Sequence, residues 1–142
     1  MISLLFTLIT IVTPIKPNPK LTPGVADSTA TVGKICTPGY TAKVRNVPTS
    51  VKKQVFAEYH IDPTSDKFEV DHLISLELGG SNDIKNLWPQ SYTTQPLNAR
   101  RKDVLENKLH DMICSKQITI QEAQKAISTD WVKAYNTYIP NK

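Results

Sequence analysis

The sequence predicts an α+β fold in which a short β-hairpin precedes a long helix, with further helices on either side. In residues 68–72, apolar or aromatic side chains alternate with acidic ones, which is typical of a half-buried strand. The cluster 79–83 then predicts a turn, and a second short strand is expected from Asn86. Pro96 suits the first turn of a long helix that runs to about Ser115.

The remaining elements are expected on both sides of this core. Residues 14–32 are rich in proline, threonine, serine and lysine and predict an extended linker, after which one folded domain spans 33–142. Residues 35–45 favour short strands or irregular structure. A helix is expected after Pro48 and ends at residues 62–63, which are Asp-Pro.

A final helix is expected to open at Thr119, because Glu122 completes a capping box with it. Apolar residues then recur at helical spacing, at Ala123, Ala126, Ile127, Trp131, Ala134 and Tyr138. The chain contains no coiled-coil heptads, so we expect a monomer.

The first twelve residues form an uncharged, apolar stretch that is shorter than the roughly 20 residues needed to cross a bilayer. They suit the hydrophobic region of a signal peptide, although no Lys or Arg precedes them and no Ala-x-Ala site follows. A truncated signal or a lipid-facing anchor is the alternative, and the prolines that follow disfavour a buried strand. We interpret residues 1–13 as a signal peptide or apolar N-terminal segment, and expect a secreted or periplasmic protein without a stable membrane span.

The two cysteines, Cys36 and Cys114, are expected to form one disulfide, because an even count behind an export-like segment favours pairing. The bond would close a loop of 78 residues, and the chain-entropy relation then gives about 4.5 kcal/mol of stabilisation. Two buried free thiols are the alternative if the protein stays in a reducing compartment.

Composition bounds the function only broadly. With 142 residues, 39% of them hydrophobic and 21% charged, the chain is large enough for one ordered domain with its own core. The net charge of +4 suits a polyanionic partner, yet many proteins that bind no nucleic acid carry as much.

A carboxylate, an imidazole and an amide carry the functional prediction. Asp71 and His72 are adjacent, and Asn86 follows fourteen positions after His72. An imidazole titrates near neutral pH and can take a proton from the water that attacks phosphorus. A carboxylate is a hard oxygen ligand for Mg²⁺ or Mn²⁺, and Asn86 is expected to hold the loop and the His72 ring by hydrogen bonds. Because neighbours in a strand point to opposite faces, a kink or bulge is expected at Asp71 and His72.

These residues resemble the HNH, or ββα-metal, nucleases, with the motif core at residues 66–115. The strings DHLISLELGG, NLWPQ and KDVLENKLH are similar to those of a small exported bacterial subgroup, which often has proline where this chain has Ser75. The resemblance implies a metal-dependent endonuclease with one divalent ion, Mg²⁺ or Mn²⁺. In that interpretation His72 is the general base, Asp71 a metal ligand and Asn86 the orienting residue.

The resemblance also implies that a His or Asn on the helix completes the metal site. Asn98 is the first candidate and could equally cap the helix, whereas Asn107, Glu106 and His110 are alternatives on the same helix. These candidates occupy two neighbouring faces of the helix, and the pattern leaves open which face meets the strand. Arg100 stands where related sequences can carry His, and its guanidinium is no metal ligand at neutral pH.

His110 and Cys114 are spaced i, i+4 and could therefore also bind zinc. The paired Cys-x-x-Cys motifs of zinc-stapled HNH domains are absent from the sequence, so we expect a disulfide in place of structural zinc.

Basic residues make the start of the long helix a candidate phosphate-contacting surface, through Arg100, Arg101 and Lys102. A second basic group comprises Lys43, Arg45, Lys52 and Lys53. For each residue alone, a solvated helix face is the alternative. We expect nucleic acid as the partner, DNA rather than RNA, with little sequence specificity.

Three functions follow from these observations. The first is an exported, metal-dependent endonuclease. The second is an HNH scaffold that binds nucleic acid or another partner without cutting, and the third is a structural, disulfide-stapled extracellular domain.

Overall fold

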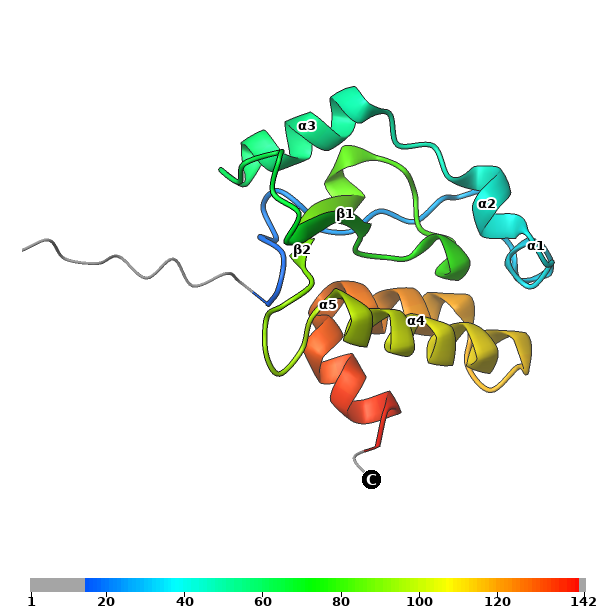
Figure 1. Ribbon diagram of the computed structural model, residues 1–142. Helices are drawn as coiled ribbons and strands as arrows, with labels where there is room; N and C mark the ends of the chain where they lie inside the picture. Colours follow the sequence, from blue (N-terminus) through cyan, green and yellow to red (C-terminus); the bar gives the residue numbers. More distant parts are fainter. Residues whose placement is uncertain (1–14, 141–142) are drawn as a thin grey trace, which may run out of the picture.

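The computed structural model describes residues 15–140 and confirms the α+β fold (Figure 1). An antiparallel hairpin is formed by β1 (Phe68–His72) and β2 (Leu87–Ser91), with two 3₁₀ turns between them, η1 (Leu76–Leu78) and η2 (Ile84–Asn86). The helices are α1 (Val32–Ile35), α2 (Tyr40–Val44), α3 (Thr49–Glu58), α4 (Ala99–Cys114) and α5 (Ile120–Tyr138). The predicted signal segment 1–13 lies outside the described residues. No helix within 15–140 has the length and apolar character that a membrane crossing requires.

The hairpin lies between two helical layers. Helices α4 and α5 cover one side of it and α3 lies on the other, as Figure 1 shows. The core fills the space between the hairpin and α4–α5, where Trp88 of β2 joins Leu105 and Leu109 of α4 and Trp131 of α5, all at most 1% exposed. This apolar contact fixes which face of α4 meets the hairpin.

The strand register runs without interruption, from Phe68 opposite Ser91 to His72 opposite Leu87. The bulge expected near Asp71 is therefore absent from the hairpin, and that prediction is wrong. In a continuous ladder, neighbouring side chains point to opposite faces. Asp71 accordingly points toward α4, whereas His72 points toward the other side of the hairpin.

Capping groups define the two long helices. The Asn98 side chain accepts a hydrogen bond from the Arg101 amide, so α4 begins at Ala99 and Pro96 precedes it instead of occupying its first turn. The predicted capping box of Thr119 and Glu122 is present at the start of α5.

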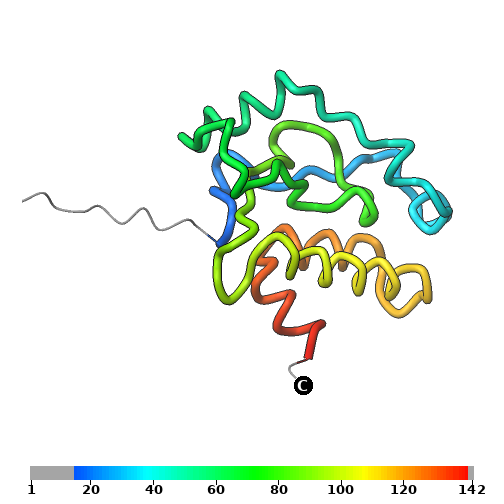
Figure 2. Tube along the Cα trace, in the orientation of Figure 1, coloured from blue at the N-terminus to red at the C-terminus, as the bar shows by residue number. Residues whose placement is uncertain are grey.

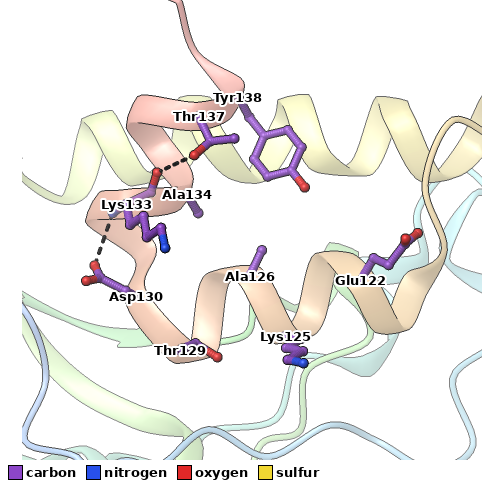
Figure 3. A pocket seen from close by; sticks show the side chains of 9 residues that line it. All are labelled: Glu122, Lys125, Ala126, Thr129, Asp130, Lys133, Ala134, Thr137 and Tyr138. Atoms are coloured by element: carbon purple, nitrogen blue, oxygen red, sulfur yellow. Dashed lines mark hydrogen bonds between the residues drawn. The ribbon is translucent and has the colours of Figure 1, made fainter.

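Helix α5 bends at Asp130, whose backbone leaves the helical region. The Asp130 carboxylate accepts a hydrogen bond from the Lys133 amide and so caps the second half of the helix (Figure 3). The two halves enclose an open hollow of about 370 Å³. Its lining contains none of the residues that the sequence predicted for function.

Two stretches differ from prediction. Residues 32–44 form the short helices α1 and α2, not strands. The predicted linker is extended but packs along the hairpin, behind it in the view of Figure 2. Thr22 is 1% exposed and donates to the Leu87 carbonyl, while Ala26 forms a β-bridge with Gly80. This segment is therefore part of the folded unit, because its own polar groups pair with the hairpin and loop.

The predicted disulfide is present and joins Cys36, directly after α1, to Cys114, the last residue of α4. It ties the helices that precede the hairpin to the helix that follows it.

Candidate functional site

Asn86 organises the loop between the strands. Its side chain is fully buried and makes four hydrogen bonds to the backbone, accepting from the amides of Ile74 and Val25 and donating to the carbonyls of Ile74 and Ser81. All four bonding positions of the amide are thus used. Asn86 holds the loop as the sequence predicted, but none of these bonds reaches the His72 ring.

The two adjacent glycines are required for different reasons, Gly80 by a close backbone approach and Gly79 by its positive φ. A Cβ atom on Gly80 would lie 1.7 Å from the Ile74 carbonyl oxygen, and Gly79 has a φ of +78°. Any side chain at Gly80 would therefore push the loop away from the end of β1, where Asp71 and His72 lie.

The His72 ring is held by Asn82 instead. His72 Nε2 lies 3.1 Å from Asn82 Oδ1, which also accepts from the Asn46 amide at 3.2 Å. Asn82 Nδ2 donates to the Val44 carbonyl at 2.8 Å, so both ends of the Asn82 amide are assigned by backbone partners. An oxygen faces the ring, so Nε2 must carry the hydrogen. The neutral imidazole therefore keeps its lone pair on Nδ1.

Burial is the largest influence on the charge of His72 and lowers its pKa below the usual range. The hydrogen bond that His72 donates to Asn82 and the charge of Asp71 oppose this shift, and the charges of Arg45 and Lys102 add to it. With its pKa lowered, His72 is neutral at neutral pH and is a base with one available nitrogen.

Asn82 is a residue of the candidate site that sequence reasoning missed, since it stood in a segment interpreted only as a turn. The only hint in the sequence was that this turn position carries an asparagine, whose amide can form hydrogen bonds, although glycine or aspartate would also suit the turn.

Asp71 is held by a buried lysine. Lys102 is 0% exposed, and its ammonium donates to Asp71 Oδ2 and to the His72 carbonyl oxygen, both at 2.8 Å, and also to the Glu106 carboxylate. Burial alone would lower the pKa of Lys102, but the charges of Asp71 and Glu106 outweigh it and raise that pKa. Burial raises the pKa of Glu106. The prediction that Lys102 contacts nucleic acid is wrong, because all three of its donor positions face protein oxygens.

Further carboxylates surround the outer side of Asp71. Burial and then the Asp71 charge raise the pKa of both Glu69 and Asp103. Burial, followed by the hydrogen bond to Glu69, raises the pKa of Tyr92 to about 12. The repulsion from Asp71 disfavours the ionised forms of Glu69 and Asp103, and the charge of Lys102 offsets part of it.

The predicted helix ligands do not gather around Asp71. Asn98 acts as the helix cap, and Asn107 is exposed. Glu106 is on the Asp71 side but is engaged by Lys102. His110 lies elsewhere, where its Nε2 contacts the Ile35 carbonyl oxygen at 3.0 Å and Cys114 Sγ at 3.5 Å.

Arg100 and Arg101 are exposed at the start of α4, and Arg45 is exposed near His72. Their placement is compatible with the predicted phosphate contacts. Within residues 15–140, only Cys36, His110 and Cys114 form a group of three or more His, Cys, Asp or Glu residues whose ligand atoms converge within 4.8 Å.

No family model, curated protein or solved structure matches this chain. The resemblance to HNH nucleases therefore rests on the sequence motifs alone, and the nuclease activity stays a prediction.

Proposed function

We propose that this chain is a metal-dependent endonuclease that hydrolyses phosphodiester bonds in nucleic acid, with His72 as its general base. The state of the His72 imidazole carries the proposal. Its pKa is lowered by burial, and Asn82 fixes the tautomer so that Nδ1 alone can accept a proton. In this mechanism Nδ1 takes a proton from water as the water oxygen attacks phosphorus and the ester oxygen leaves.

The other groups are assigned by what they face. Arg45, near His72, would hold the phosphate at the point of attack, while Arg100 and Arg101 would hold phosphates further along the strand. Lys102 would act as a positioning residue, since it clamps Asp71 Oδ2 and the His72 backbone together.

A hard divalent ion would be held through Asp71, with water completing its shell, since no group of three carboxylates converges there among the described residues. Asp71 Oδ1 makes no hydrogen bond among the described residues, the Asp71 side chain is 15% exposed, and the nearby Asp103 and Glu69 carboxylates repel it. Oxygen donors of this kind suit Mg²⁺ or Mn²⁺. Such an ion would neutralise charge on the phosphate and on the leaving oxygen.

The test is nicking of supercoiled plasmid by the oxidised protein with Mg²⁺ or Mn²⁺, with EDTA as the metal-free control. His72→Ala should abolish nicking, whereas His60→Asn, at an exposed histidine, should leave it unchanged. Asp71→Asn should reduce nicking and raise the metal concentration needed. Nicking that persists in His72→Ala at the wild-type rate would refute the proposal.

A second function, binding without cleavage, is favoured by the ion pair of Lys102 with Asp71. The ammonium already supplies a positive charge at one oxygen of the proposed metal ligand. A protein of this kind would retard labelled DNA in a salt-dependent manner, lose affinity in Arg100→Ala and Arg101→Ala, and show no turnover with any metal.

A further inference from the structure

The disulfide lies beside a histidine and a carboxylate that the proposed nuclease site does not use. Cys36, Cys114 and His110 place their sulfur and nitrogen atoms within 4.8 Å of one another, and His110 Nε2 is 3.5 Å from Cys114 Sγ. In a tetrahedral zinc site, bonds of about 2.3 Å to sulfur and about 2.0–2.1 Å to nitrogen separate these atoms by about 3.5 Å. The histidine is thus already at ligand spacing from one sulfur.

Glu77 lines the adjacent hollow, although its carboxylate oxygens are not part of the converging group. Glu77 and His110 both line a hollow of about 240 Å³ beside Cys36. Glu77 forms no hydrogen bond or ion pair with any residue of the described chain, and burial raises its pKa, while the charge of His110 opposes that shift. A carboxylate that lacks a partner in a partly buried cavity is a natural ligand for a cation.

The exposed Asp111 carboxylate lies on the Nδ1 side of the histidine, with its Oδ1 atom 4.0 Å from His110 Nδ1, beyond hydrogen-bond distance. If Nε2 bound a metal, the proton would sit on Nδ1 and face this carboxylate. Histidine ligands commonly have a carboxylate in this place.

We propose that the reduced form of this protein binds one Zn²⁺ ion through Cys36, Cys114 and His110, with Glu77 or water in the fourth position. The staple between α1 and α4 would then exist in two forms, a disulfide under oxidising conditions and a zinc site under reducing ones. This proposal is independent of the nuclease proposal, because Asp71 and His72 take no part in it.

The conversion of the disulfide into a zinc site conserves electrons and protons. A thiol reductant, itself oxidised to a disulfide, delivers two electrons and two protons and turns the Cys36–Cys114 bond into two thiols. Zn²⁺ then displaces both thiol protons to the buffer, while the His110 proton moves from Nε2 to Nδ1 and the Nε2 lone pair binds the metal.

The experiment is titration of the full folded chain with Co²⁺, as a coloured substitute for zinc, after reduction with a phosphine that leaves no thiol behind. We expect one equivalent to bind with a thiolate-to-cobalt absorption band, and Zn²⁺ to displace it. The oxidised protein should show no such band. Cys36→Ser should lose it, and His110→Ala should weaken Zn²⁺ at least about 10–100-fold, as even loss of an outer-shell partner does.

Separate controls show whether each variant is folded. Oxidised His110→Ala keeps the disulfide, so its thermal midpoint shows whether the fold is intact, and reduced His60→Asn should bind as wild type does. If zinc refolds a reduced chain that has lost structure, the site is supported. A reduced protein that gives no thiolate band, or His110→Ala with unchanged Zn²⁺ affinity, would overturn the proposal.

Discussion

Replacing Lys102 by methionine should destabilise the protein strongly, because it removes a fully buried cation from two largely buried carboxylates. Lys102 is 0% exposed and holds the carboxylates of Asp71 and Glu106, whose side chains are 15% and 9% exposed. Removing one partner of such a pair leaves an uncompensated buried charge and costs about 3–5 kcal/mol. For a chain of this length, the melting temperature should fall by roughly 6–20 °C.

The penalty should depend on pH with a definite sign. Burial raises the pKa of Glu106 above its ordinary value of 4.5, and loss of the ammonium raises it further. The folded variant then holds a proton that the unfolded chain releases above pH 4.5, so its stability falls as pH rises. Because burial raises the pKa of Glu106 to about 8 in the wild type as well, the part of the deficit that comes from Glu106 should grow only as the pH rises through about 8.

Urea unfolding followed by tryptophan fluorescence would measure this, since Trp88 and Trp131 are buried. The double variant Lys102→Met/Glu106→Leu should recover only part of the loss, because it removes the buried Glu106 carboxylate but leaves Asp71 without its partner. Lys108→Met, at an exposed position of the same helix, is the matched control and should change stability by less than about 0.5 kcal/mol. A Lys102→Met penalty below about 1 kcal/mol at pH 7.5 would refute the reasoning.

Three further predictions concern the loop, the base and the staple. Asn86→Ala leaves four backbone groups without partners and should cost at least about 3 kcal/mol of unfolding free energy in urea titrations; a cost under about 1 kcal/mol would contradict the assigned role. Asn82→Ala removes a hydrogen bond that raises the pKa of His72, so NMR titration of the ring should show that pKa lowered further, and an upward shift would be inconsistent with the assigned geometry. The free energy of unfolding of the double variant Cys36→Ser/Cys114→Ser should be about 4.5 kcal/mol lower than that of the oxidised wild type in zinc-free buffer. Equal stability of the two proteins would show that the bond does not stabilise the fold by restricting the unfolded chain.

Local chemistry explains why much of the fold could be predicted. Strand alternation at 68–72, the turn cluster 79–83 and the capping box at Thr119 each report on interactions between residues close in sequence. The Asn98 cap was anticipated on the same ground. The linker was misjudged because Thr22 pairs with Leu87, and proline content says nothing about such distant partners.

The candidate site also has one part that the sequence predicted and one part that it did not. Residue types and spacing identified Asp71, His72 and Asn86, and the structure shows Asn86 holding the loop as expected. The spacing did not reveal that Asn82 orients His72, since that contact depends on how residues 44–46 and the loop meet.

The sequence by itself determined the hairpin, the two long helices, the pairing of the two cysteines and the set of groups available for chemistry. Only the tertiary structure decided which face of α4 meets β1, and with it that Lys102 is buried against Asp71 instead of facing solvent. The reason is physical: helical periodicity places Lys102 on a face, but the burial of Trp88 against Leu105 and Leu109 chooses the face that turns inward.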